Sequence, residues 1–368
     1  MNAVSTSIAR DASTAAEATM ATATAPATAP VSAVTATAGG LSMTRKLGLG
    51  GLFGLAAVAA AAGVGVSLLI SSNTVMSLLT QALIYAVVAL GLGFLLKQNG
   101  MVSFGHALFF GMSGYLIGLA VHFTGWSAGA VIGLTVLLTG VFAFALALVI
   151  VRVPGIAFGM LTLSIGQGFY VMVSKSRGVT GGADGLNINF PAQVFGFELS
   201  VFQTPSSMFL VCWLVLVAVI LGLSLLLRTR FGPLTEAIRE NEERVRFIGF
   251  RTLLPRAAVF AISAMITAVG GALSALYTGF VSPESLHWSV SGTVLIMVVL
   301  GGSRTLWGPV LGAVVYYLFR DYLGEHTSHW LSIFGVSLIA VIVLWPTGIA
   351  GGVLRAAARL RRREGSAQ

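Results

Sequence analysis

Charged residues are scarce in this sequence. They make up 9% of its 368 residues, whereas 56% are hydrophobic, and the mean hydropathy is +0.93. A soluble domain carries roughly a quarter charged residues to cover its surface, so the composition excludes a soluble globular protein. Apolar runs of about 20 residues recur along the chain and are typical of transmembrane helices. The sequence therefore predicts an all-α polytopic integral membrane protein.

Cysteine and phosphate-binding loops are also missing. Cys212 is the only cysteine, which excludes an internal disulfide and a multi-cysteine metal site. None of the three lysines, Lys46, Lys97 and Lys175, follows a glycine, so the pattern GxxxxGK[ST] is absent. We expect no metal and no cofactor in this chain, and no ATP hydrolysis by it.

Carboxylates are absent from the apolar runs. Charged side chains are almost absent from these runs, and His106 is the one clearly ionisable group near the start of a run. Ionisable residues at membrane depth usually mark proton or ion paths, so a stand-alone secondary transporter or channel is disfavoured. If this chain moves a solute uphill, we expect another protein to supply the energy.

The apolar runs define ten candidate membrane segments. They cover residues 47–70, 75–96, 103–122, 128–151, 155–173, 207–227, 257–280, 289–302, 306–320 and 330–347. At about 1.5 Å per residue, residues 289–302 and 306–320 are short for a core of about 30 Å. We expect these two to be tilted, half-length or re-entrant, which gives about 8–10 transmembrane or half-membrane helices.

The two ends of the chain differ from this apolar part. Residues 1–42 are rich in Ala, Thr and Ser and lack periodicity, which predicts a disordered tail. Translation can start at Met1 or at Met43, because Met43 opens the basic stretch MTRK. We predict a membrane domain over residues 43–350 and a basic tail over 351–368.

Basic residues are distributed asymmetrically around the segments. If the N-terminus is cytoplasmic and the segments alternate, 18 of the 21 Lys and Arg residues lie inside. Lysine and arginine collect in cytoplasmic loops, so both termini are predicted to be cytoplasmic. The net charge of +9 then reflects topology and contact with anionic lipid, and we expect no nucleic-acid partner.

One internal loop, residues 228–256, carries 11 of the 33 charged residues. Leu234, Ile238, Val245 and Ile248 recur at helical spacing there, which predicts an amphipathic helix that Gly249 ends. The pairs Glu240–Arg244 and Glu242–Arg246 have the i,i+4 spacing that supports a helix. This helix either lies at the membrane surface or docks into a partner protein.

Four stretches point to a known family. They are FGPLTEAIRENEERVRFIGF (231–250), NGMVSFGHALFFGMSGY (99–115), GIAFGMLTLSIGQGFYVMV with TGGADGL (155–173 and 180–186), and VSPESLHWSVSGTVLIMVVLGGSRTLWGPVLGAV (281–314). Over residues 75–347 the sequence resembles the permease subunits of branched-chain amino acid ABC transporters, of the high-affinity leucine/isoleucine/valine type.

The resemblance implies one subunit of an ATP-driven importer in the bacterial inner membrane. Its partners would be a second homologous permease in a heterodimer, two ATPase subunits that use ATP and Mg²⁺, and a periplasmic substrate-binding protein. The loop 228–256 would hold the coupling helix that docks into the ATPase. The residues expected there are Leu234, Glu236, Ala237, Ile238, Arg239, Glu240, Asn241, Glu243, Arg244, Ile248 and Gly249.

Several uncharged polar groups interrupt the apolar runs and are candidates for the translocation path. They are Ser103, His106, Thr162, Ser164 and Gln167. Thr180, Gly181, Gly182 and Asp184 of the stretch TGGADGL, expected at the outer end of a span, are further candidates. The alternative is that they form hydrogen bonds between helices, or, for Asp184, that it caps a turn. The external loop 175–206 is long enough to meet a binding protein, and Glu284 and His287 are further exterior candidates.

The cargo stays open at this stage. Branched-chain amino acids lead, with urea or short-chain amides as the nearest rival and aromatic carboxylates as a further alternative, because substrate choice in this family rests largely with the binding protein. A membrane scaffold that transports nothing would not need polar residues at membrane depth.

Overall fold

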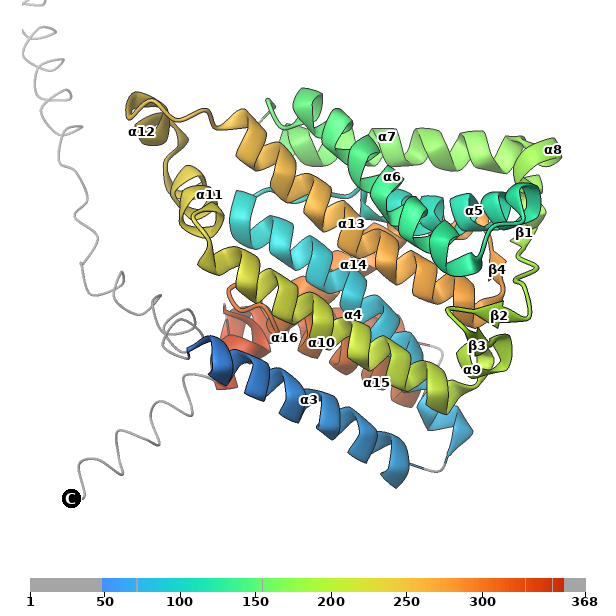
Figure 1. The fold of residues 1–368 in the computed structure, drawn as a ribbon. Helices are drawn as coiled ribbons and strands as arrows, with labels where there is room; N and C mark the ends of the chain where they lie inside the picture. The colour runs from blue at the N-terminus through green and yellow to red at the C-terminus, as the bar shows by residue number, and fades with distance from the viewer. Residues whose placement is uncertain (1–47, 71, 154, 328, 346, 354–368) are drawn as a thin grey trace, which may run out of the picture. The chain divides into compact units, whose positions relative to one another are not determined.

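Ten long helices form a bundle in the computed structural model, which describes residues 48–70, 72–153, 155–327, 329–345 and 347–353 (Figure 1). All of these residues belong to the unit that begins at Thr44. The helices are α3 (Leu49–Leu69), α4 (Asn73–Asn99), α5 (His106–Thr124), α6 (Ala128–Ile150), α7 (Ile156–Lys175), α10 (Pro205–Arg228), α13 (Leu253–Thr278), α14 (Trp288–Gly301), α15 (Gly308–His326) and α16 (Trp330–Leu344).

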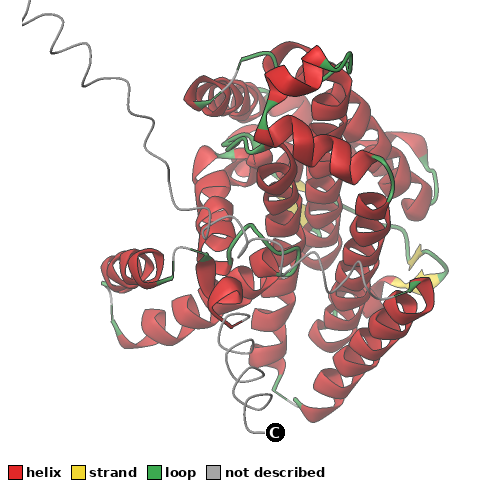
Figure 2. Ribbon diagram, turned by 90° about the vertical axis from the view of Figure 1, so that its left-hand side faces the viewer, coloured by secondary structure: helices red, strands yellow, loops and turns green. Residues whose placement is uncertain are grey.

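Short elements lie at both ends of the bundle. One end carries α11 (Phe231–Glu240) and α12 (Glu242–Phe247) and is called the α12 end below; Figure 2 looks onto this end. The opposite end, called the strand end, carries two small antiparallel sheets, β1–β4 and β2–β3. Its elements are α8 (Arg177–Thr180), η3 (Gly182–Asp184), β1 (Leu186–Asn187), β2 (Gln193–Val194), β3 (Phe197–Glu198), α9 (Leu199–Gln203), β4 (Phe280–Val281) and η4 (Pro283–Leu286).

The helices α4 and α13 form the centre of the bundle. In each of them 78% of the most apolar window is buried, against 11% in α3 and 22% in α10. Helix α13 packs against α4, α5 and α6, and α4 also packs against α15 and α10. The outer helices therefore present apolar side chains outward, as expected for helices in contact with lipid or with another membrane subunit.

Small residues let the central helices approach closely. A Cβ on Gly91 of α4 would lie 2.8 Å from the carbonyl oxygen of Ser263 in α13, and one on Gly270 would lie 3.4 Å from the carbonyl oxygen of Ile84. A Cβ on Gly271 would overlap the carbonyl oxygen of Phe110 in α5. Van der Waals packing of backbones at this separation is the main force between helices in a membrane.

The structure confirms the predicted fold class and most of the predicted segments. Eight helical stretches are long and apolar enough to span a membrane, and the short segment 289–302 is the 14-residue helix α14. The segment 306–320 is longer than predicted, because α15 continues through Arg320, Asp321 and Glu325. Residues 1–42, Met43 and the tail beyond 353 lie outside the described residues, so the predicted tails and start site remain predictions.

The close contact between α5 and α13 gives a test of this packing. We expect Gly271→Ala to destabilise the protein by about 1–3 kcal/mol, because the added methyl group has no space between the helices. The measurement is the melting temperature in detergent. Gly168→Ala is the control, because a Cβ on Gly168 meets no atom within 4 Å. Equal melting temperatures for the two variants would contradict the packing described.

Candidate functional site at one end of the helix bundle

The charged loop forms two helices, and Asn241 separates them. Asn241 has an extended backbone (φ −157°, ψ 96°), and its side-chain oxygen accepts the N–H of Arg244 at 2.9 Å, so it caps the start of α12. Gly249, at φ 94°, ends α12: its N–H donates to Arg246, and that of Phe250 donates to Val245. The chain therefore turns sharply twice within ten residues.

The prediction of one continuous amphipathic helix was wrong. Asn241 was expected within the helix, but it breaks the helix. Its side-chain oxygen accepts the N–H of Arg244, in place of the backbone carbonyl oxygen that a continuous helix would offer. The Glu242–Arg246 pair forms at 2.6 Å, whereas no ion pair joins Glu240 to Arg244 across the break. Gly249 ends the second helix, as predicted. The first helix starts at Phe231.

The four apolar residues that predicted the amphipathic helix differ in their burial. Ile238 and Val245 are buried at 4% and 7% exposure, so they pack within the chain, and Leu234 is half-buried. Ile248 is exposed, together with three neighbours that the sequence did not single out: Phe247 (90% exposed), Phe250 and Leu254. We call Phe247, Ile248, Phe250 and Leu254 the apolar tip.

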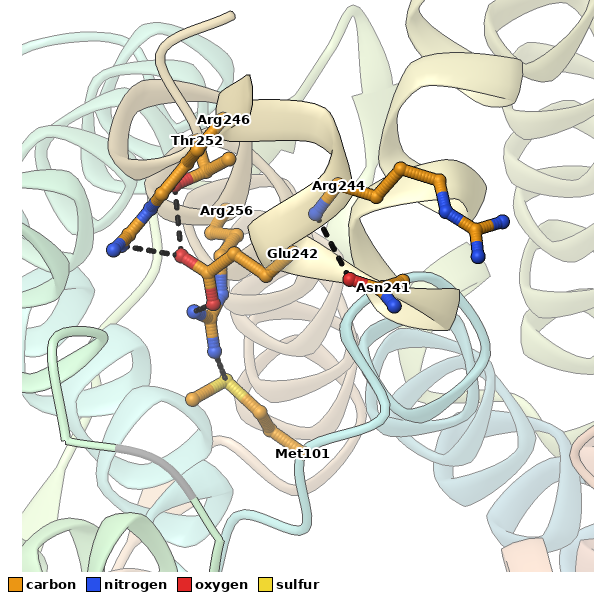
Figure 3. Close-up of polar contacts among 7 residues, drawn as sticks. All are labelled: Met101, Asn241, Glu242, Arg244, Arg246, Thr252 and Arg256. Atoms are coloured by element: carbon orange, nitrogen blue, oxygen red, sulfur yellow. Dashed lines mark hydrogen bonds and ion pairs between the residues drawn. The ribbon is translucent and has the colours of Figure 1, made fainter. Parts of the chain in front are cut away.

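A carboxylate that the sequence did not select holds α12 in place. Figure 3 shows Glu242 accepting hydrogen bonds from Thr252 (2.7 Å) and Arg246 (2.6 Å), and from Arg256 on its other oxygen. Burial raises the pKa of the Glu242 carboxyl, but the Thr252 hydroxyl and the positive charges of Arg256 and Arg246 lower it more. The net pKa lies below its ordinary value of 4.5.

Arg256 extends this cluster into the bundle. It is 9% exposed and lies in the first turn of α13. Its guanidinium lies 3.4 Å from the sulfur of Met101, and its carbonyl oxygen accepts the side-chain amide of Asn99 at 3.0 Å. The cluster of Glu242, Thr252 and Arg256 therefore connects α12 to both α13 and the turn between α4 and α5.

The first short helix, α11, is attached to the end of α4. The Thr235 hydroxyl donates to the side-chain oxygen of Gln98 at 2.7 Å, and the guanidinium of Arg239 donates to the carbonyl oxygen of Lys97 at 2.7 Å. The other selected polar residues and Ala237 point outward. These exposed residues are Glu236, Ala237, Glu240, Asn241, Glu243 and Arg244.

Sequence patterns favoured exposed residues and missed the buried anchors. Glu242, Thr252 and Arg256 are 14 residues apart at most along the chain, and only the i,i+4 spacing of Glu242 and Arg246 hinted at a role for this carboxylate. Thr235 and Gln98 gave no signal, because their contact joins positions 137 residues apart.

Two of the candidate path residues form a hydrogen-bond network between helices. The hydroxyl of Ser263 donates to the carbonyl oxygen of Gly91 at 2.6 Å, so its oxygen accepts Nε2–H of His106 at 2.7 Å. Nδ1 of His106 then accepts the hydroxyl of Ser103 at 3.1 Å. This network joins α4, α5 and α13. It agrees with the alternative interpretation of Ser103 and His106, in which they form hydrogen bonds between helices.

Three further candidates, Thr162, Ser164 and Gln167, lie on α7 and differ in their hydrogen bonds. Thr162 bonds to the carbonyl oxygen of Gly159 and to the N–H of Phe104, whereas Ser164 is exposed and bonds to Met160 of its own helix. The side-chain oxygen of Gln167 is buried without a hydrogen-bond partner among the described residues.

The glycine-rich stretch at the strand end forms tight turns. Gly181, Gly182 and Gly185 all have positive φ. Thr180 donates to the carbonyl oxygen of Val173 at 2.7 Å, and Asp184 is exposed. Whether any of the nine candidates contacts a solute remains a prediction.

Comparisons with known proteins agree with the four motifs. A family model described as "Branched-chain amino acid transport system / permease component" matches residues 74–344. The high-affinity branched-chain amino acid permease protein LivM of Escherichia coli K12 is 26% identical over 76% of this chain and 71% of its own. LivM of Salmonella typhimurium is 27% identical over 73% and 68%.

Other import permeases are similar as well. The autoinducer 2 import permease LsrC of Salmonella paratyphi B is 26% identical over 68% of this chain and 70% of its own. No solved structure matches.

The anchoring of α12 by Glu242 can be tested by removing its charge. We expect Glu242→Gln to weaken the attachment of α12 by about 1–3 kcal/mol, because the buried guanidinium of Arg256 loses its charged partner. Hydrogen–deuterium exchange of residues 242–250 should then become faster. Glu243→Gln, an exposed neighbour, is the matched control and should exchange like the unmodified protein.

The stabilisation of α12 by Glu242 should be lost in acid. Because the folded-state pKa of Glu242 is lowered, its stabilising effect is complete above the ordinary value of 4.5 and is lost as the pH falls through the lowered pKa. The difference in exchange between the unmodified protein and Glu242→Gln should therefore vanish in acid. A difference that persists there would show that Glu242 acts through something other than its charge.

Proposed function

The chain belongs to the family of branched-chain amino acid transport permease components, and we propose that it forms the membrane path of an ATP-driven importer for leucine, isoleucine, valine or a related small amino acid. The family match over residues 74–344 is the observation that carries this proposal. The two LivM relatives, similar over about three quarters of the chain, support this choice of cargo.

The α12 end is assigned to the cytoplasm of a bacterial inner membrane. The seven arginines of residues 228–256 lie at this end, and positive charge favours the cytoplasmic side. Both termini are then cytoplasmic. The strand end, with the external loop 175–206, faces the periplasm and receives the solute from a binding protein.

The apolar tip is proposed as the contact with an ATPase subunit. Phe247, Ile248 and Phe250 are exposed beyond the end of the bundle, where lipid tails do not cover them. Exposed aromatic side chains of this kind are typical anchors of protein interfaces. Arg239, Glu240, Glu243 and Arg244 are exposed on α11 and α12 and would provide polar contacts at the rim of the interface.

Force from the ATPase would enter the bundle through the anchors of α11 and α12. The Glu242–Arg256 pair leads to α13 and to the α4–α5 turn, and Thr235 leads to α4. Both central helices are therefore attached to the docking segment. The proposed assembly contains two ATPase subunits that bind ATP and Mg²⁺, and a second homologous permease.

Other cargoes remain distinguishable from this proposal. The similarity to autoinducer 2 import permeases shows that related chains serve other solutes, and urea or short-chain amides are the principal alternative. A stand-alone channel or secondary transporter would not need the apolar tip.

The docking proposal predicts a specific loss. We expect Phe247→Asp to abolish co-purification with the ATPase subunits and ATP-dependent uptake, because a charge replaces an anchor of the interface. Membrane insertion should be unchanged, since Phe247 contacts little of its own chain. Phe197→Asp, at the exposed strand end, should retain the ATPase; if both variants retain it, the apolar tip is not the docking site.

Reconstitution tests the cargo. Liposomes are reconstituted with this chain and its partner subunits, and the binding protein is added on the side of the strand end. They should accumulate labelled leucine when ATP is supplied on the side of the membrane that carries the ATPase subunits. Labelled urea and an ATP-free sample are the controls. Uptake of urea but not leucine would change the cargo, and leucine uptake without ATP would contradict the energy source.

A further inference from the structure

A cavity of about 290 Å³ opens at the strand end and is lined by the middle of α4, the first half of α5, the last two turns of α13, the start of α14 and the segment that contains β4 and η4. None of the nine candidate path residues lines it. Its size is near the lower limit for small-molecule sites, which begin at roughly 300 Å³. The cavity therefore has room for a solute of about the size of an amino acid.

One wall of the cavity is apolar. Tyr85 and Phe110 contribute aromatic rings whose centroids are 5.6 Å apart, and Val281 and Val290 complete the wall. Phe110 and Val281 are buried at 5% and 6% exposure, so the packing of the bundle fixes their positions. This wall suits a short aliphatic chain.

The opposite rim offers hydrogen-bond acceptors. The hydroxyl of Thr278 donates to the carbonyl oxygens of Ser274 and Phe280, and that of Ser285 donates to the carbonyl oxygen of Ser282. These protons are already used, and the Thr278 oxygen also accepts the N–H of Phe280 at 3.3 Å, so each hydroxyl oxygen can offer a ligand only a remaining lone pair as an acceptor. The carboxylate of Glu284 lies among them and is exposed to the cavity mouth.

The charge at the cavity has one sign. Among the described residues that line it there is one carboxylate and no lysine, arginine or histidine. A bound carboxylate would therefore find no cation, whereas an ammonium group would find Glu284 and the two hydroxyl oxygens.

We propose that this cavity binds the protonated amino group of small aliphatic amines and amino acids, with Glu284 as the counter-ion and the alkyl group against Tyr85, Phe110, Val281 and Val290. The proposal rests on the proposed function for its role in transport, as the first site that the solute meets in the permease. Recognition is directed at the ammonium group, and the carboxylate of an amino acid stays toward the mouth.

Labelling of an introduced cysteine tests the proposal on the full-length chain in membrane vesicles. Ser282→Cys places a thiol on the cavity rim, and the native Cys212 is buried within α10, so the unmodified chain provides the background. We expect a cationic methanethiosulfonate reagent to react faster than an anionic one. 3-Methylbutylamine and leucine should slow the labelling, whereas 3-methylbutanoate should not.

Glu284→Gln in the Ser282→Cys chain should reduce both the preference for the cationic reagent and the protection by 3-methylbutylamine, roughly two- to fivefold, as for a partly exposed ion pair. Glu198→Gln is the matched control, because Glu198 is exposed at the same end but does not line the cavity. If Ser282→Cys fails to insert, Ser285→Cys replaces it as the reporter.

Equal rates for the two reagents, equal protection by the amine and the acid, or no effect of Glu284→Gln would overturn the proposal. The uptake assay separates the two failures. Leucine uptake without the labelling pattern would contradict the ammonium site but support the proposed importer. The labelling pattern without leucine uptake would support the ammonium site and contradict the proposed function.

Discussion

The close packing of α4 against α13 is the constraint on which the rest of the bundle depends. Gly91 and Gly270 allow the two backbones to meet, and the hydroxyl of Ser263 closes the gap by bonding to the carbonyl oxygen of Gly91. His106 then joins α5 to the same point. Because membrane helices gain little from the hydrophobic effect between them, this contact of small and polar residues sets the positions of the outer helices.

The charged segment at the α12 end is built on those two helices. Its attachments are to the last turn of α4 and the first turn of α13, through Thr235 and Gln98 and through Glu242 and Arg256. A displacement of α11 and α12 would therefore act directly on both central helices and on α10, which ends just before α11 begins. The cavity at the strand end is lined by the middle of α4 and the last two turns of α13, so the same two helices connect α11 and α12 with the proposed ammonium site.

Much of the fold could be predicted, because apolar length is a property of the sequence. The short helix α14 followed from its 14 residues, and the positive φ of Gly249 followed from its place after a helical run. The prediction was wrong in two places. Arg320 and Asp321 were expected to end a segment that continues as α15, and Asn241 was expected inside a helix that it interrupts.

The sequence by itself determined the class of protein, the approximate number of long helices and the position of the charged loop, since these depend on composition and on local periodicity. The tertiary structure decided which residues act. Glu242 meets Arg256, Thr235 meets Gln98, and Glu284 meets an aromatic wall from α4 and α5 only after the helices have packed. Such contacts join distant positions, and no local pattern of residues encodes them.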